Sequence, residues 1–208
     1  MRNWNDDPFT KKARAENYEA RSVYKLEEID RREKILNGAK LILDLGAAPG
    51  SWTQYCLKKL PRVRILAVDL SPLNVKDARI TFLQKPIEEV KFEEALGAER
   101  PDLVLSDMAP KTSGIHERDV ALSFELASLA LNVALQWLKP GGHFVAKLFM
   151  GDSFEEYDRA LRQHFSEVKR LRPESTRKHS REIFFIGKGL KGTHFLLGIP
   201  KGSGYPSE

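Results

Sequence analysis

Cysteine is almost absent from this chain of 208 residues, which contains only Cys56. A single cysteine cannot form an internal disulfide or supply a cysteine-rich zinc site. The five histidines are scattered without the spacing of metal ligands, so we expect no required metal. A reducing cytoplasm is the expected setting, and Cys56 is expected to pack in a helix rather than act as a nucleophile.

Long hydrophobic runs are also missing. No apolar run reaches the roughly 18–20 residues that span a bilayer, and the first seven residues are polar where a signal peptide would be apolar. We therefore expect a protein that is neither inserted in a membrane nor secreted. We separately expect a monomer. With 41% hydrophobic and 30% charged residues, the chain can bury one sizeable core. We expect a single domain: a helical extension (1–36), a core (37–188) and a C-terminal extension (189–208).

Positive charge exceeds negative charge, with 34 Lys and Arg against 29 Asp and Glu. The excess lies in residues 169–181, KRLRPESTRKHSR, which contain six Lys or Arg and one Glu. A second basic group, Lys11, Lys12, Arg14 and Arg21, lies near the N-terminus. A basic group taken alone is explained equally well as a solvated face or as a surface for an anionic partner. The two groups form a nucleic-acid footprint only if the fold brings them together.

Short apolar runs alternate with helical patterns, which predicts an α/β fold with a mostly parallel sheet. Seven strands are expected, at residues 40–45, 63–70, 80–83, 102–107, 143–149, 168–171 and 183–188. The last two are separated by too few residues for a crossover helix, so they should pair antiparallel at one end of the sheet. The predicted architecture is Rossmann-like, with helices on both faces.

The helical segments have recognisable patterns. Polar residues recur every three or four positions over 121–138, which predicts an amphipathic helix rather than a membrane span. Ser153 and Glu156 form a capping-box pattern that should open a helix toward Phe165. The first thirty or so residues are predicted to form a helix, and the apolar run 194–199 suggests no function.

A glycine-rich turn follows the first predicted strand, in the sequence DLGAAPG at residues 44–50. Gly46 and Gly50 allow the backbone to approach a ligand closely, and Asp69 on the next strand offers a ribose an acceptor. Pro49 removes an N–H that a pyrophosphate would use. The pattern therefore favours S-adenosylmethionine over NAD, although a purely structural turn is the simpler alternative.

Four charged residues stand where packing does not explain them. Asp107 follows the fourth strand at the carboxyl edge of the sheet, where open α/β folds bind ligands. Lys147 interrupts the apolar strand FVAKLF, and Glu182 opens the last strand. Lys25 lies in an apolar stretch of the N-terminal helix, where a surface lysine would be ordinary. A buried lysine must be paired or neutral, so Lys147 is either catalytic or part of a structural Lys–Asp pair.

These segments together resemble the FtsJ/RrmJ family of S-adenosylmethionine-dependent RNA ribose 2′-O-methyltransferases. The resemblance extends from about Arg21 to Lys188, through five blocks in order: RSVYKL, DLGAAPGSW, SDMAP, FVAKLF and SREIFF. It implies a catalytic set of Lys25, Asp107, Lys147 and Glu182. It also implies cofactor contacts at Gly50, Trp52 and Asp69, with Asp107 near the methyl group, and a uridine of the large-subunit ribosomal RNA as substrate.

One position departs from the family pattern. Pro86 stands where relatives commonly carry an acid that reaches the adenine, and proline can offer neither a polar side chain nor an N–H. Adenine recognition must then come from backbone groups, Ile87 or Glu88.

The resemblance suggests in-line methyl transfer to a ribose hydroxyl with Lys147 as general base. Burial and the second ammonium of Lys25 favour a neutral lysine, whereas Asp107 and Glu182 oppose it. The basic residues 172–181 lead into Glu182 and are expected to guide an RNA backbone toward Lys147. The expected partner is ribosomal RNA in the large ribosomal subunit. A tRNA- or cap-directed 2′-O-methyltransferase, a non-catalytic RNA-binding relative and an NAD-dependent oxidoreductase are the alternatives.

Overall fold

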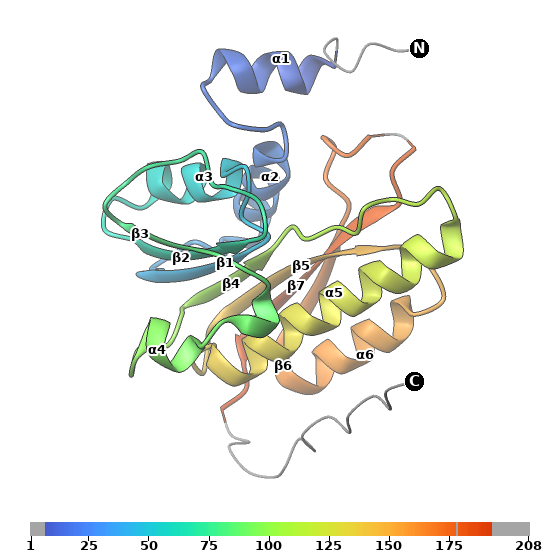
Figure 1. The fold of residues 1–208 in the computed structure, drawn as a ribbon. Helices are drawn as coiled ribbons and strands as arrows, with labels where there is room; N and C mark the ends of the chain where they lie inside the picture. Colours follow the sequence, from blue (N-terminus) through green and yellow to red (C-terminus); the bar gives the residue numbers. More distant parts are fainter. Residues whose placement is uncertain (1–6, 178, 193–208) are drawn as a thin grey trace, which may run out of the picture.

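The computed structural model describes residues 7–177 and 179–192, and a seven-stranded mixed sheet forms its centre (Figure 1). The strand order is β3-β2-β1-β4-β5-β7-β6. The strands are β1 (Leu41–Leu45), β2 (Arg64–Asp69), β3 (Ile80–Gln84), β4 (Leu103–Ser106), β5 (His143–Phe149), β6 (Phe165–Leu171) and β7 (Glu182–Leu190).

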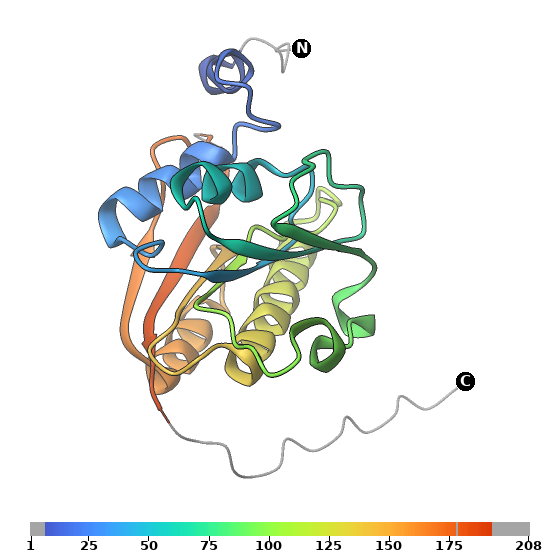
Figure 2. The same cartoon turned by 90° about the vertical axis from the view of Figure 1, so that its left-hand side faces the viewer.

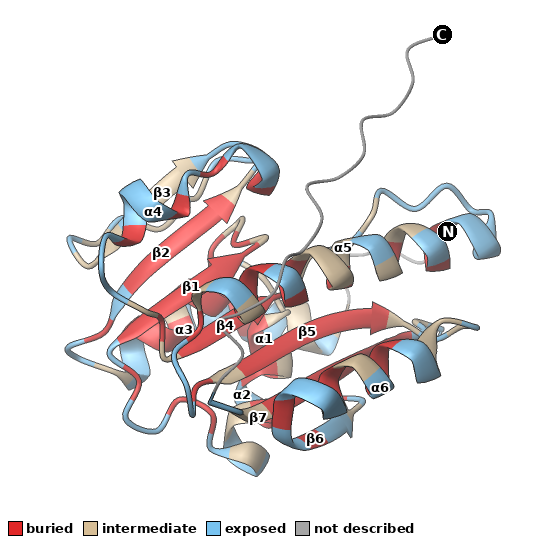
Figure 3. Ribbon diagram, turned by 90° about the horizontal axis from the view of Figure 1, so that it is seen from below, coloured by how far each residue is buried: buried red, intermediate tan, exposed pale blue. Residues whose placement is uncertain are grey.

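The pairing of the strands confirms the predicted fold class. Strands β1 to β5 run parallel, and β7 is antiparallel to both β5 and β6. The apolar strands of the centre are buried on both faces, as a parallel sheet covered by helices requires (Figure 3). β6 begins at Phe165, three residues earlier than predicted, because Phe165 pairs with Leu190 and packs its ring on Phe144.

Helices cover both faces of the sheet (Figure 2). Residues of α1 (Pro8–Ala15), α2 (Val23–Glu33) and α3 (Ser51–Lys59) pack into the core on one face. Residues of α4 (Phe92–Leu96), α5 (His116–Trp137) and α6 (Phe154–His164), with the short 3-10 helix η2 (Ile87–Glu89), pack into the core on the other face. The parallel strands point their carboxyl ends to one edge, which is where the functional residues gather.

Helix α5 is long and apolar enough to cross a membrane by length and composition alone. In the structure it packs along β4 and β5, with Ala127, Ala130 and Ala134 in the core. The polar residues Glu125 and Gln136 lie on its outer side, where neither is buried. This arrangement is that of a core-covering helix, as its polar periodicity predicts.

The N-terminal segment is not one helix as predicted but two. The chain breaks at Asn17, which has a left-handed backbone (φ 56°), before α2 begins at Val23. Tyr24 joins the two helices, because its ring lies 5.6 Å from that of Phe9 and its hydroxyl donates to Glu16.

The capping box at Ser153 was also predicted incorrectly. Helix α6 begins at Phe154 as expected, but the Ser153 side chain makes no capping hydrogen bond. Backbone bonds open the helix instead, from Phe154 N–H to Gly151 and from Tyr157 N–H to Ser153. The apolar run 194–199 lies outside the described residues.

Candidate functional site

A cavity of about 610 Å³ opens at the carboxyl ends of β1, β2 and β4. This volume is in the range of sites for small ligands. Four segments line it: Gly46, Ala48 and Pro49; Val68, Asp69, Leu70, Ser71 and Pro72; Lys85, Pro86, Ile87 and Glu88; and Asp107, Met108 and Ala109, with Leu126 and Leu129 from α5. The cavity lies where the glycine-rich turn and Asp69 predicted a ligand.

Gly46 forms one wall of this cavity and has no room for a side chain. Its φ is +75°, and a Cβ there would lie 2.6 Å from Cγ of Met108. Its N–H and that of Ala47 both donate to the Val68 carbonyl, which ties the turn to β2. Glycine is therefore required both by the backbone conformation and by the close approach of Met108.

Asp69 ends β2 and holds two loops around the cavity. Its Oδ2 accepts the N–H of Ala48 at 2.9 Å, and its Oδ1 accepts the N–H of Ser71 at 2.7 Å. A carboxylate has about four acceptor positions, so Asp69 can still receive the two hydroxyls of a ribose. The predicted role of Asp69 is thus compatible with its structural one.

The segment after β3 forms the wall opposite the glycine turn. Pro86 lines the cavity as the cap of η2, with Lys85, Ile87 and Glu88 beside it. Both residues considered for adenine recognition, Ile87 and Glu88, therefore line the cavity. Adenine recognition by Ile87, by Glu88 or by backbone groups stays a prediction.

Gly50 and Trp52 are not among the residues that line the cavity. Gly50 has φ +123°, and a Cβ there would lie 2.3 Å from a methyl carbon of Val75. The absence of a side chain at Gly50 therefore lets the loop that carries Val75 pack against this turn. Trp52 is 3% exposed. Its indole N–H donates to the Ser22 carbonyl at 2.9 Å and its ring lies 5.7 Å from that of Phe184. The Trp52 side chain thus joins α3 to the start of α2, and its expected cofactor contact stays a prediction.

Lys147 and Asp107 form an ion pair beside the cavity. The Lys147 Nζ donates to Asp107 Oδ1 at 2.8 Å and to the Asp107 carbonyl at 2.7 Å. The lysine side chain is 6% exposed, while Asp107 is 17% exposed and lines the cavity. The pairing of β4 with β5 produces this contact, because Ser106 lies opposite Ala146.

Lys25 and Glu182 form a second ion pair, with Nζ and Oε1 2.7 Å apart. Both side chains are nearly buried, at 12% and 11% exposure. In the pairing of β5 with β7, Lys147 lies opposite Phe184, and the Lys25 ammonium lies 5.8 Å from the Phe184 ring centre. The fold therefore brings all four predicted residues to one edge of the sheet, on the face covered by α2.

Asp44 is a residue of this region that the sequence analysis did not single out. It is fully buried at the end of β1, and its Oδ2 accepts the Thr53 hydroxyl at 2.7 Å. Burial raises the pKa of Asp44 to about 7, and the charges of Asp107 and Asp69 add to this effect. The sequence did contain a signal for Asp44, because it is a charged residue within the apolar strand LILDL. Lys147 was identified by the same kind of signal.

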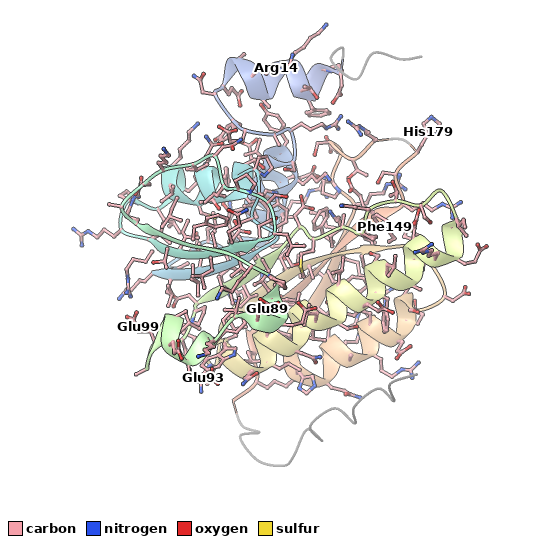
Figure 4. The ribbon with its side chains drawn as sticks, in the orientation of Figure 1. Arg14, Glu89, Glu93, Glu99, Phe149 and His179 are labelled. Atoms are coloured by element: carbon pink, nitrogen blue, oxygen red, sulfur yellow. The ribbon has the colours of Figure 1, made fainter. Side chains whose placement is uncertain are left out.

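The two basic segments converge as a nucleic-acid footprint would require. Arg21 donates to the carbonyl of Ser175 in the loop between β6 and β7, residues 172–181, here called the basic loop. Figure 4 shows Arg14 on α1 and His179 on this loop at the same side of the molecule. Lys178 of this loop lies outside the described residues.

No group of three or more histidine, cysteine or acidic side chains that could hold a metal occurs within residues 7–177 and 179–192. Cys56 is buried in α3, and this burial raises the pKa of its thiol well above the usual range. A thiol held in this way is a packing residue rather than a nucleophile.

Known proteins are similar to this chain in sequence. Ribosomal RNA large subunit methyltransferase E from Bdellovibrio bacteriovorus is 46% identical over 190 residues, which cover 89% of this chain and 97% of that protein. The protein of the same name from Sorangium cellulosum is 48% identical over 184 residues, covering 87% and 86%.

Solved structures and a family model agree with these relatives. A protein from Plasmodium falciparum, described as a ribosomal RNA methyltransferase, superposes with a TM-score of 0.74 at 28% identity, covering 85% of this chain and all of that one. The N-methyltransferase NodS from Bradyrhizobium japonicum shares the fold, with a TM-score of 0.55 at 16% identity over 90% and 99% of the two chains. The model of the FtsJ-like methyltransferases matches residues 18–190. Because this match and the relatives span most of the sequence, the chain belongs to the FtsJ-like methyltransferase family.

Proposed function

We propose that this protein transfers a methyl group from S-adenosylmethionine to the 2′-hydroxyl of a uridine in large-subunit ribosomal RNA, as a cytoplasmic monomer. The observation that carries the proposal is the Lys147–Asp107 ion pair, whose carboxylate lines a cofactor-sized cavity, with the Lys25–Glu182 pair on the neighbouring strand β7 and helix α2. The names of the relatives supply the class of RNA.

The cavity suits S-adenosylmethionine by size and by charge. Asp69, Glu88 and Asp107 contribute three carboxylates to its lining, against one lysine, Lys85. Such a lining favours a cation and disfavours the pyrophosphate of NAD. Asp69 would hold the ribose, Gly46 would let the ligand approach the backbone, and Asp107 would lie near the positive sulfur. When bound, the cofactor supplies a methyl group already activated for transfer.

The protein then has to orient the ribose hydroxyl and remove its proton. Lys147 is the proposed general base, because it is buried beside the cavity and its ammonium position is fixed by two oxygens of Asp107. Lys25 is proposed to contact the ribose or its phosphate, and Glu182 holds Lys25 in place.

The basic loop and α1 provide a surface for an RNA backbone beside these residues. Lys11, Lys12 and Arg14 are exposed on α1, and Arg177 and Arg181 are exposed on the basic loop. Contacts of this kind bind phosphates without reading sequence. The 2′-hydroxyl is accessible along RNA without base flipping, which agrees with a methyl acceptor on the ribose.

The proposal is tested by offering labelled S-adenosylmethionine with large ribosomal subunits, free ribosomal RNA and tRNA in parallel. We expect label in the 2′-position of a large-subunit uridine, lost in Lys147→Met. Label in tRNA alone would overturn the substrate class. Bound cofactor without methyl transfer to any RNA would overturn the proposed activity and favour an RNA-binding relative.

A further inference from the structure

Glu28 is a buried carboxylate in α2 whose main partner is distant in the sequence. Its side chain is 7% exposed, and its Oε2 accepts the backbone N–H of Glu174, in the basic loop, at 2.7 Å. Its Oε1 lies 2.7 Å from the guanidinium of Arg32. Burying a carboxylate is costly unless it is paired, so a role in packing alone would be better served by an apolar side chain.

The position of Glu28 on α2 connects the basic loop to the proposed catalytic residues. Glu28 is three residues after Lys25, so both side chains project from one face of the helix. Lys25 pairs with Glu182, which directly follows the basic loop. Helix α2 therefore holds this loop near its beginning through Glu28 and just after its end through Lys25.

Arg21 adds a second contact to the first part of the loop. Its guanidinium donates to the Ser175 carbonyl and to the Asp7 carboxylate. Glu28 thus accepts the backbone N–H of Glu174, and Arg21 donates to the carbonyl of Ser175. These are adjacent residues of one turn. Ser175 is only 3% exposed, which shows how closely this turn lies against its neighbours.

We propose that Glu28 is a positioning residue that docks the basic loop on α2 and so aligns the RNA-binding side chains with Lys25 and Glu182. It contacts no reacting group and acts through the loop, and this role rests on the proposed RNA methylation. A loop held in its binding conformation loses less entropy when RNA binds. Losing Glu28 should therefore weaken RNA binding and slow transfer, without changing the affinity for S-adenosylmethionine.

The hydrogen bond itself can be removed from the loop side. The Thr176 N–H donates to the Pro173 carbonyl at 2.9 Å, so Glu174 is the second residue of a turn, a position that accepts proline. Glu174→Pro removes the N–H that Glu28 binds. Glu174→Ala keeps this N–H and loses only the side chain, with its exposed 3.4 Å contact to Arg32. Comparing the two variants isolates the bond to Glu28.

We expect Glu174→Pro and Glu28→Ala each to raise the dissociation constant for RNA by about fivefold or more. Their single-turnover rates should fall, and amide hydrogen exchange in the basic loop should become faster. Glu174→Ala should stay close to wild type, as should Glu27→Gln, which alters the exposed neighbour of Glu28. Glu28→Gln keeps an oxygen acceptor for the Glu174 N–H and should restore part of the RNA affinity. Cofactor affinity should change less than twofold in all of them.

Equal RNA affinity and loop exchange in Glu174→Pro and Glu174→Ala would overturn the role of Glu28. A parallel loss of cofactor affinity in Glu28→Ala and Glu174→Pro would also overturn it, because the defect would then be one of general stability. Failure of the wild type to methylate any RNA would instead overturn the proposed function. The exchange and RNA-binding measurements would still decide the role of Glu28, so the two failures are distinguishable.

Discussion

Lys147 donates hydrogen bonds to two oxygens of Asp107, the carboxylate Oδ1 at 2.8 Å and the main-chain carbonyl at 2.7 Å. The carbonyl contact fixes the ammonium relative to the backbone just after β4, and not only to the Asp107 side chain. Because Asp107 also lines the cavity, Lys147 is held beside the space where a ligand would bind.

Replacing Lys147 by methionine should remove the proposed base and keep most of the buried volume. We expect the single-turnover rate of methyl transfer to fall by about 100-fold or more, with little change in cofactor affinity. Lys188→Met is the matched control, since Lys188 is a strand lysine that pairs with Glu33 outside the site. A Lys147→Met rate within about fivefold of wild type would exclude the general-base role.

The Lys25–Glu182 pair should behave as a unit. Lys25→Met and Glu182→Gln should each slow methyl transfer about 10- to 100-fold, and the double variant should be no slower than the worse single one. The double variant should also unfold at a higher temperature than Lys25→Met, because Lys25→Met leaves the carboxylate of Glu182 buried without its partner. Rates and thermal unfolding of all four proteins test this. The exposed Arg64–Glu99 pair is the control, and strictly additive effects at Lys25 and Glu182 would contradict the prediction.

Gly46→Ala should weaken cofactor binding more than its backbone strain alone explains. An alanine at φ +75° costs about 1–2 kcal/mol, and its Cβ would also lie 2.6 Å from Met108 at the cavity wall. Gly141→Ala has the same kind of strain, with φ +78° and no atom within 4 Å of the new Cβ. Calorimetric titration with S-adenosylmethionine should show a clear loss for Gly46→Ala alone. Equal affinities in the two variants would show that this contact does not shape the site.

The buried Asp44 should make stability depend on pH. Its pKa is about 7 in the folded protein and near 4 when unfolded, so the folded state binds the proton more tightly. The resulting stabilisation is complete below pH 4 and is lost as the pH rises toward 7, with a slope of at most about 1.4 kcal/mol per pH unit. Urea unfolding between pH 4 and 8 should show this loss in wild type and not in Asp44→Asn. Parallel curves for the two proteins would contradict the assignment.

RNA binding should weaken steeply with added salt. If the basic loop contacts phosphates, Arg177→Gln should lower the slope of log K against log salt by about one, for RNA of any sequence. Arg64→Gln, at the amino-terminal end of β2, should leave the slope unchanged. Filter binding at salt concentrations from about 50 to about 300 mM tests both variants. An unchanged slope in Arg177→Gln would remove Arg177 from the RNA-binding surface.

The sequence by itself determined the class of fold and most of the site. Alternating apolar strands and helices specify a mostly parallel sheet, because strands buried on both faces have an unmistakable composition. The short connection before Glu182 predicted the antiparallel last strand. Lys147 was recognisable as a candidate because an ammonium is costly to bury in an apolar strand unless it is paired or neutral. The glycine turn and Asp69 located the cavity, since ligands of such folds bind at the carboxyl edge of the sheet.

Only the tertiary structure decided which of these residues are in contact. Lys25 meets Glu182 across 157 positions of sequence, and Glu28 meets the backbone of Glu174, because α2 packs over the ends of β5 and β7. The break at Asn17, the side chain of Trp52 turned toward Ser22 and the burial of Asp44 also escaped the sequence analysis. Local patterns report which segments form strands and helices and in what succession, whereas a side chain's partners depend on how distant elements pack, and one chain alone carries no local signal for that.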